Sequence, residues 1–376
     1  MKIIADENIP LLDAFFSDMS HELIKLPGRD MSAADVHDAD VLLVRSITKV
    51  NEALLKGSAV KFVGTCTIGT DHIDQEYLAK HKIAFRNAPG CNANAVVDYV
   101  LSALTCLAQA RGKVFTDFSV GIMGAGNVGG RLYKTLIALG MDVCIYDPFI
   151  EEFSDSALKK KVFSQNVVSL HTPITYEGEH KTHYLVDKKQ LETMQANACL
   201  INSCRGLVVN NADLLSHLKI NPDFEAVMDV WEDEPAPSDE LLETCFLATP
   251  HIAGYSLDGK YNGTSMIYES LCEFLALPKR LKLAQLIDEP CLRKISFSKE
   301  SQSEYQLVKT IRNAYDIRDD HFRMMGLLRL SDTEKAQTFD GLRKKYPYRR
   351  DRQCLVVSGR GLDETKLAAL DVKLKK

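Results

Sequence analysis

The stretch FSVGIMGAGNVGG, residues 118–130, joins an apolar run to a glycine-rich turn and then to a helical pattern. Its centre, GAGNVG at 124–129, has the spacing G-x-G-x-x-G between a strand and a helix, which is typical of a dinucleotide-binding unit. These glycines permit a tight turn, close approach of a pyrophosphate and close packing of the helix on the strand. Free N–H groups and the dipole at the start of the helix favour the diphosphate anion. We therefore expect a dinucleotide to bind at Gly124, Gly126, Asn127, Val128 and Gly129.

An acidic residue follows the next predicted strand. Residues 142–146 are strand-like, and Asp147 comes 18 residues after Gly129, near the interval expected for a ribose-binding carboxylate. A carboxylate there accepts hydrogen bonds from the ribose hydroxyls and repels a 2′-phosphate. The sequence therefore predicts NAD rather than NADP as the cofactor. The alternative is a glycine-rich turn followed by an ordinary Asp at the end of a strand.

Short apolar runs alternate with helical spacing along the first 280 residues. One series covers 2–5, 40–44, 61–65 and 83–88, and a second covers 118–123, 143–146, 166–170, 198–203, 224–230 and 245–248. Strands that alternate with helices predict parallel, doubly wound α/β sheets. We expect a flavodoxin-like substrate domain formed by residues 1–95 and 256–280, and a Rossmann NAD domain formed by residues 96–255.

The composition changes near residue 281. Residues 281–376 hold 21 Lys or Arg and 14 Asp or Glu, whereas residues 1–280 hold 25 and 37. Charged helical stretches and one strand-like run, 353–358, predict a third, smaller α/β domain over 281–376. The basic string at 349–352 is the one candidate for a nucleic-acid patch. The net charge of −5 and the absence of a recognisable DNA or RNA motif favour a solvated or subunit-contacting face instead.

Composition excludes several classes of protein. With 45% hydrophobic and 26% charged residues, the 376-residue chain is typical of a folded globular protein. Asp6 and Glu7 interrupt the start of the chain where a signal peptide is apolar, and the apolar stretch 95–110 is too short to span a membrane. The ten cysteines form no C-x-x-C pair, and no metal-ligand spacing occurs. We expect a cytoplasmic protein with no membrane, nucleic-acid or metal partner.

Three later predicted strands are each followed by ionisable residues: Arg205, the acidic segment 229–234 and His251. Parallel strands bring their carboxyl ends to one edge of a sheet. Arginine, a carboxylate and histidine are the groups needed to oxidise a 2-hydroxy acid. The guanidinium fixes the substrate carboxylate or polarises the C2 oxygen, and the imidazole removes the hydroxyl proton while C2 gives a hydride to nicotinamide. The acid that pairs with the histidine stays open among Glu232, Asp233 and Glu234.

Three motifs extend this pattern: NSCRG at 202–206, DVWEDEP at 229–235 and TPHIAGY at 249–255. With the glycine loop, they make the chain resemble the D-isomer-specific 2-hydroxyacid dehydrogenases. The resemblance implies that the catalytic residues are Arg205, Glu234 and His251. It also implies that the NAD site is lined by Asp147, Thr172, Ser203, Cys204, Arg205, Asp229 and Gly254.

Further stretches resemble one group within that family. They are ADEN at 5–8, VRSITKVN at 44–51, FVGT at 62–65, APGCNA at 88–93, YDIRDD at 315–320 and FDGLRKKY at 339–346. This likeness implies oxidation of 4-phospho-D-erythronate to 3-hydroxy-2-oxo-4-phosphooxybutanoate in pyridoxine biosynthesis. It also implies a homodimer held by the C-terminal domain, and substrate contacts from Ser46, Thr67 and Tyr255. Arg45, beside Ser46 at a predicted strand end, is our candidate for binding the phosphate.

Two other functions fit the same sequence features. Another enzyme of the family, such as phosphoglycerate dehydrogenase, shares the chemistry and differs in the substrate pocket, although the third domain argues against it. An NADH-sensing corepressor is a candidate from a different class, because some proteins of this fold regulate transcription.

Overall fold

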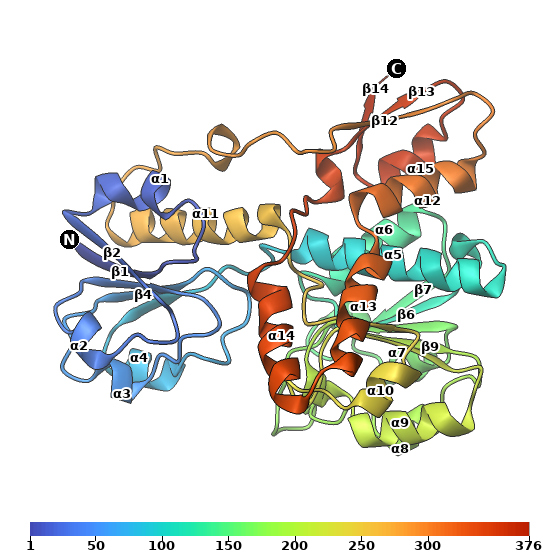
Figure 1. Ribbon diagram of the computed structural model, residues 1–376, viewed down its shortest axis with the longest axis horizontal. Helices are drawn as coiled ribbons and strands as arrows, with labels where there is room; N and C mark the ends of the chain where they lie inside the picture. Colours follow the sequence, from blue (N-terminus) through green and yellow to red (C-terminus); the bar gives the residue numbers. More distant parts are fainter. Residues whose placement is uncertain (376) are drawn as a thin grey trace. The chain divides into compact units, whose positions relative to one another are not determined.

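Three parallel β-sheets organise residues 1–375, which are the residues described by the computed structural model (Figure 1). These residues belong to two units. Unit 1 comprises Met1–Asn92 and Ser256–Glu289, and unit 2 comprises Ala93–Tyr255 and the chain from Pro290 onward. The parallel, doubly wound arrangement predicted from the sequence is confirmed.

Unit 1 contains a five-stranded sheet in the order β2-β1-β3-β4-β5, which is the flavodoxin-like order. Its strands are β1 (Lys2–Asp6), β2 (Glu22–Leu26), β3 (Val41–Val44), β4 (Phe62–Thr65) and β5 (Ala84–Arg86). Its helices are α1 (Leu12–Phe16), α2 (Ala33–Val36), α3 (Glu52–Leu55), α4 (Gln75–Lys80) and α11 (Leu257–Phe274). The sequence did not predict β2, because this edge strand has no fully buried residue and lacks a continuous apolar run.

Helix α11 packs on the sheet of unit 1. Ile267 and Leu271 of this helix are fully buried in the same core as Ile3 and Leu43. A Cβ atom on Gly64 of β4 would lie only 2.6 Å from the Ile267 side chain. Glycine at this position therefore permits the close approach of helix and strand.

Unit 2 contains a six-stranded sheet in the order β11-β10-β9-β8-β6-β7. The strands are β6 (Val120–Met123), β7 (Val143–Tyr146), β8 (Val167–Leu170), β9 (Cys199–Asn202), β10 (Glu225–Met228) and β11 (Leu247–Ala248). The helices around it are α5 (Ala93–Arg111), α6 (Gly129–Ala138), α7 (Ser156–Phe163), α8 (Lys188–Glu192), α9 (Asn211–Ile220) and α10 (Asp239–Thr244). The strand order reverses between β6 and β8. Ligands of such sheets bind beyond the strand ends at this reversal.

Helix α5 lies in the core of unit 2. Among residues 1–375 it is the one helix that is long and apolar enough to cross a membrane, but 83% of its apolar window is buried in the protein. Such burial is typical of the core helix of a globular protein.

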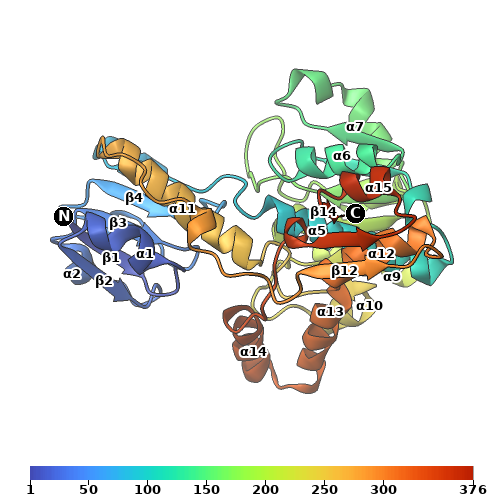
Figure 2. The ribbon, with the colours of Figure 1, turned by 90° about the horizontal axis from the view of Figure 1, so that it is seen from above.

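The chain from Pro290 onward adds a three-stranded sheet and four helices to unit 2. The strands are β12 (Lys294–Phe297), β13 (Val356–Gly359) and β14 (Lys373–Lys375), and the helices are α12 (Ser303–Ala314), α13 (Ile317–Met325), α14 (Asp332–Lys344) and α15 (Glu364–Ala369). Helices α13 and α14 lie side by side (Figures 1 and 2). The prediction of a single strand here is wrong. Strands β12 and β14 escaped it because they are short, lysine-containing and largely exposed.

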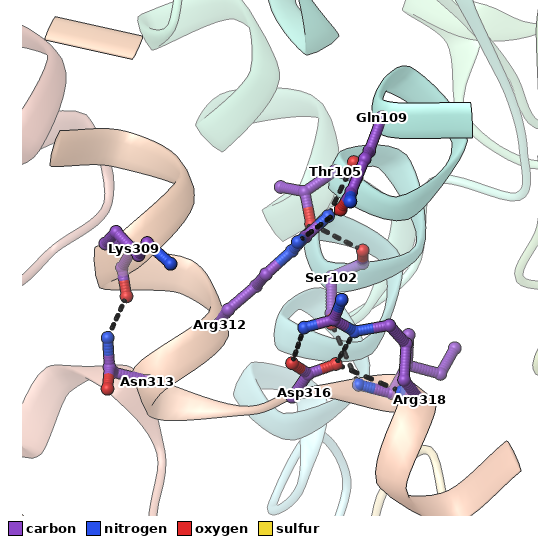
Figure 3. Close-up of polar contacts among 9 residues, drawn as sticks. Ser102, Thr105, Gln109, Lys309, Arg312, Asn313, Asp316 and Arg318 are labelled. Carbon is purple, nitrogen blue, oxygen red and sulfur yellow. Dashed lines mark hydrogen bonds and ion pairs between the residues drawn. The ribbon is translucent and has the colours of Figure 1, made fainter. Parts of the chain in front are cut away.

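The C-terminal helices are fastened to α5 by hydrogen bonds (Figure 3). Arg312 of α12 donates from Nε to Thr105 Oγ1 (3.0 Å) and from Nη1 to Gln109 Oε1 (2.6 Å). The backbone N–H of Ile317 donates to Ser102 Oγ (3.0 Å). These contacts join the start of α13 and the end of α12 to the core helix of the NAD-binding part.

The basic string 349–352 is mostly buried. Arg349 is 5% exposed, Asp351 3% and Arg352 2%. Arg352 forms an ion pair with Asp98 of α5, which is also 2% exposed, and its backbone N–H donates to the same carboxylate (3.1 Å). The expectation of a solvated or subunit-contacting face is therefore wrong for these three residues. The burial of Arg352 was not predicted, because the sequence does not show that the buried carboxylate of Asp98 lies beside it.

Removing the guanidinium of this pair should destabilise unit 2. We expect Arg352→Gln to lower the free energy of unfolding by about 3–5 kcal/mol, because it removes the ion-pair partner of the buried Asp98 carboxylate. Urea unfolding followed by the fluorescence of Trp231, which lies in unit 2, measures this change. The control is Lys188→Gln, which breaks the exposed Lys188–Glu192 pair and should cost less than about 1 kcal/mol. Equal losses in the two variants would contradict the prediction.

Candidate active site

The glycine loop has the geometry that its sequence predicts. Gly124 has φ +94°, and a Cβ atom on it would lie 2.6 Å from the carbonyl oxygen of His171 in the loop after β8. A Cβ atom on Gly129 would lie 1.9 Å from the carbonyl oxygen of Gly124. Around Gly126, by contrast, no atom of the described residues lies within 4 Å of such a Cβ. The loop is therefore closed on the protein side and open at Gly126, where a pyrophosphate can approach.

Asp147 lies immediately after β7 and contacts the same loop. Its Oδ2 atom accepts a hydrogen bond from the backbone N–H of Ala125 (2.8 Å), and its Oδ1 atom accepts one from the N–H of Phe149 (3.0 Å). The carboxylate is thus held at the carboxyl edge of the sheet, beside the glycine loop. This is the position from which it can accept hydrogen bonds from an adenosine ribose.

A buried hydroxyl group near the strand ends lacks a partner. Ser203 Oγ, after β9, is buried and makes no hydrogen bond with the described residues, whereas the buried Thr172 Oγ1, after β8, has the Cys204 thiol beside it. Buried polar groups are normally satisfied, so such atoms at the edge of a cofactor-binding sheet indicate a missing polar partner. NAD, with its carboxamide, ribose and phosphate groups, fits this site chemically.

Substituting Asp147 by alanine should change cofactor selection. We expect NAD affinity to fall about tenfold or more, because hydrogen bonds to a charged group contribute about 1.5–3 kcal/mol. The preference for NAD over NADP should narrow as well, since the repulsion of the 2′-phosphate is removed. Fluorescence titration with both cofactors measures the two dissociation constants. Asp142→Ala, at the exposed opposite end of β7, is the control, and an unchanged NAD-to-NADP ratio in Asp147→Ala would refute the assignment.

His251 is held in an unusual backbone conformation after β11. Its φ is +58°, a left-handed value that costs energy in a residue other than glycine. The buried Asp229 fixes this loop: its carbonyl oxygen accepts from the His251 N–H (2.7 Å), and its carboxylate accepts from the N–H groups of Ile252 and Ala253 (2.8 Å each). Asp229 therefore positions the loop that carries the histidine.

A chain of hydroxyl groups completes the support of this loop. Thr249 Oγ1 donates to Asp229 Oδ1 (2.6 Å) and also contacts the hydroxyl of Tyr99 in α5 (2.8 Å). Because the only hydroxyl proton of Thr249 points to the carboxylate, Tyr99 is the donor in the second bond. Burial raises the pKa of Asp229, and these hydrogen bonds act in the opposite direction.

Glu234 is the acid that faces the histidine. Its Oε2 atom lies 2.7 Å from His251 Nδ1, and its Oε1 atom accepts from the Trp231 N–H (3.0 Å). Burial opposes its ionisation, but the hydrogen bond and charge of His251 prevail and hold the pKa of Glu234 below its usual value. With Nδ1–H donating to Glu234, the neutral imidazole has a free electron pair on Nε2. The pair is thus arranged as an oriented general base.

The structure distinguishes Glu234 from Glu232, two of the three acids that the sequence left open. Glu232 Oε1 accepts from the Asn211 N–H (2.6 Å), and its Oε2 accepts from the Tyr184 hydroxyl (3.2 Å). Glu232 is therefore engaged with α9 and the segment before α8, whereas Glu234 contacts His251.

Arg205 lies between β9 and the next turn. Asn202 Nδ2 donates to the Arg205 carbonyl (3.0 Å), and the Arg205 Nη1 atom donates to the carbonyl of Cys204 (2.7 Å). A Cβ atom on Gly206 would lie 1.9 Å from the carbonyl oxygen of Trp231. The arginine loop thus packs directly on the loop that leads to Glu234, and only glycine allows this approach.

The substrate residues expected in unit 1 follow β3 and β4. Arg45 Nε donates to Asp6 Oδ2 (3.1 Å), and the Asp6 side chain is fully buried. Thr67 Oγ1 lies 2.8 Å from Thr65 Oγ1. Ser46 and Thr67 thus lie at the carboxyl edge of the unit 1 sheet, and Arg45 keeps other guanidinium donors besides the one used by Asp6.

Comparisons with known proteins identify the family. A family model described as "D-isomer specific 2-hydroxyacid dehydrogenase, NAD binding domain" matches residues 105–253, and a model described as a domain of unknown function matches residues 286–371. The erythronate-4-phosphate dehydrogenase of Pseudomonas fluorescens (strain Pf0-1) is 47% identical over 360 residues, 95% of this chain and 94% of the relative. The chain belongs to the erythronate-4-phosphate dehydrogenase family. The member from Hahella chejuensis (strain KCTC 2396) is 44% identical and covers 98% of this chain.

The fold of this member of the erythronate-4-phosphate dehydrogenase family is similar to that of other dehydrogenases of known structure. The NAD⁺-bound 3-phosphoglycerate dehydrogenase of Entamoeba histolytica matches with a TM-score of 0.63 and 24% identity, over 73% of this chain and 95% of that one. The D-lactate dehydrogenase of Aquifex aeolicus, in complex with NAD and lactic acid, matches with a TM-score of 0.59 and 21% identity, over 73% of this chain and 96% of that one. Part of this chain therefore lies outside the shared fold.

The sequence did not predict two further basic residues, Lys260 near Arg45 and Arg343 near Glu234. Burial, together with the charge of Arg45, lowers the pKa of Lys260 in α11. Arg343 of α14 lies close enough to Glu234 to help keep it ionised. Arg343 falls within the FDGLRKKY stretch at 339–346, but no spacing in the sequence indicates where α14 packs.

Proposed function

We propose that this protein oxidises 4-phospho-D-erythronate to 3-hydroxy-2-oxo-4-phosphooxybutanoate with NAD, in pyridoxine biosynthesis. The observation that carries this proposal is the His251–Glu234 pair, which stands at the strand ends of an NAD-binding unit in a member of the erythronate-4-phosphate dehydrogenase family. The pair supplies the proton acceptor that oxidation of a secondary alcohol requires.

In the proposed reaction, His251 Nε2 removes the proton from the C2 hydroxyl of the substrate. The imidazolium that forms is stabilised by Glu234, whose carboxylate lies 2.7 Å from Nδ1. Arg205 binds the substrate carboxylate or the C2 oxygen through its planar set of donors. When bound, NAD accepts the hydride that leaves C2. The substrate thus loses its hydroxyl proton to the histidine and a hydride from C2 to the cofactor, and C2 becomes the carbon of the keto group.

We propose that further residues bind the two ligands. The substrate contacts are Arg45, Ser46, Thr67 and Tyr255. The cofactor contacts are Gly124, Gly126, Asn127, Val128, Gly129, Asp147, Thr172, Ser203, Cys204, Arg205, Asp229 and Gly254. The buried hydroxyl of Ser203, which makes no hydrogen bond with the described residues, supports this assignment most directly.

We also propose that the protein is a cytoplasmic homodimer held together by residues 281–376. The ten cysteines are all free thiols, which fits a reducing compartment. Large exposed side chains in the C-terminal part, such as Phe322 (71% exposed) and Tyr305 (53%), suit a surface that another subunit covers. Light scattering at micromolar protein concentration should give the mass of a dimer, and a monomeric mass would refute this assembly.

A panel of substrates tests the proposed reaction. NAD reduction is measured at 340 nm with 4-phospho-D-erythronate, 3-phosphoglycerate, D-erythronate and D-glycerate. We expect the largest kcat/KM with 4-phospho-D-erythronate. A larger value with 3-phosphoglycerate would favour the phosphoglycerate dehydrogenase alternative, and no turnover with any acid despite NADH binding would favour a cofactor-sensing protein.

A further inference from the structure

Helix α14 places a guanidinium against a proposed substrate residue. The Arg343 Cζ atom lies 5.8 Å from the centroid of the Tyr255 ring, and its side chain forms a hydrogen bond with Tyr255. Tyr346, one turn further along the chain, packs edge-on against the same ring, with 5.6 Å between the centroids. Tyr255, which lies only four residues after His251, is thus contacted by two residues of the C-terminal part of the chain.

Arg343 is charged and carries an unused donor. Burial disfavours its charge most, yet the neighbouring Tyr255 and Glu234 outweigh this effect and raise the pKa of the guanidinium. Its Nε atom is buried and has no hydrogen-bond acceptor among the described residues. A buried donor of this kind is costly unless an acceptor reaches it. An anionic ligand beside Tyr255 would provide that acceptor.

The proposed substrate has two anionic groups, and they call for different cations. Arg205 is assigned to the carboxylate next to the reacting carbon, which leaves the phosphate two carbons further along. A guanidinium suits phosphate because its planar donors match two phosphate oxygens at once. Arg343 also lies within residues 286–371, outside the NAD-binding family model that covers 105–253. It is therefore placed in the part of the chain that the general dehydrogenase chemistry does not require.

We propose that Arg343 is a specificity-determining residue that binds the substrate phosphate together with Tyr255. This inference rests on the proposed function and adds a cation from the C-terminal part to the one expected at Arg45. The alternative is that Arg343 only packs on Tyr255 and supports the loop.

The test compares the loss of activity on matched acids with and without phosphate. Arg343→Gln should lower kcat/KM for 4-phospho-D-erythronate by about 10- to 100-fold, the effect of losing hydrogen bonds to a charged group. For D-erythronate, which has no phosphate, the loss of kcat/KM in the same variant should be at least about fivefold smaller than for 4-phospho-D-erythronate. Arg343→Lys keeps the charge without the planar donors, and it should show an intermediate loss. Inorganic phosphate should compete with substrate in the wild type and more weakly in Arg343→Gln.

Lys344→Gln is the matched control, because it removes the same formal charge from the exposed neighbouring residue of α14. It should leave both activities within about twofold of wild type. The NADH dissociation constant of each variant shows whether unit 2 is folded. Equal losses on the two acids in folded Arg343→Gln would overturn the phosphate assignment while leaving the proposed function intact. If the wild type itself does not prefer the phosphorylated acid, the proposed function fails, and this inference fails with it.

Discussion

His251→Asn is expected to lower kcat for alcohol oxidation by about 10²- to 10⁴-fold, the usual contribution of a positioned general base. Asparagine keeps the backbone contact to Asp229 and a polar side chain, but it cannot take up the proton of the C2 hydroxyl. NADH affinity should change little, because the glycine loop and Asp147 belong to other strand ends. Steady-state kinetics in both directions and an NADH titration measure these quantities.

The pH dependence identifies the role of this histidine. Oxidation needs the neutral imidazole, so its rate should rise with pH. Reduction of the keto acid needs the imidazolium, so its rate should fall over the same range. Because the pKa of Glu234 is lowered, this carboxylate stays ionised at pH values where a glutamate ordinarily begins to gain a proton. The change in rate with pH is therefore assigned to the histidine. His81→Asn, at an exposed position in unit 1, serves as the control. Profiles of identical shape in the two directions would contradict the assignment.

Arg205→Gln is expected to raise the activation free energy that corresponds to kcat/KM by about 2–5 kcal/mol. The reason is that loss of the guanidinium leaves a substrate anion without its partner at a desolvated site. Both kcat and KM should change, since the guanidinium orients the substrate and stabilises charge on the C2 oxygen. Arg205→Lys should recover only part of the activity, because an ammonium group lacks the planar pair of donors.

The control for Arg205 is Arg329→Gln, which removes an exposed arginine of unit 2. Its kcat/KM should match the wild type within about twofold. Unchanged kinetics in Arg205→Gln, with NADH binding preserved, would show that another group holds the substrate carboxylate.

Much of the architecture was predictable because buried parallel strands are encoded locally. The segments 120–123 and 198–201 contain no polar side chain, and each is followed by the polar or glycine residues that the structure places at the sheet edge. Strands β2, β12 and β14 were missed because exposed positions interrupt their apolar pattern. Hydrophobic periodicity reports burial, so strands that are not buried are not detected by it.

The candidate site was predictable in its residue types but not in its contacts. Glu232 is distinguished from Glu234 because it accepts hydrogen bonds from the Asn211 N–H and the Tyr184 hydroxyl. Both donors are distant from Glu232 in the sequence. The approach of Arg343 to Tyr255 depends on how α14 folds back over the loop after β11, which no local pattern encodes. Tertiary packing determines both contacts.

One buried arginine of the C-terminal part has a consequence for how catalysis and assembly are separated by experiment. Arg349 donates hydrogen bonds to the carbonyl oxygens of Ala95 in α5 (2.5 Å) and of Ile252 (3.4 Å), the residue that follows His251. A chain shortened before this arginine would lose the hydrogen bonds that support the histidine loop, and it would lose any surface used for subunit pairing at the same time. Inactivity of such a truncated protein would therefore say nothing about whether two subunits are needed for turnover, and only point substitutions at the subunit surface can answer that question.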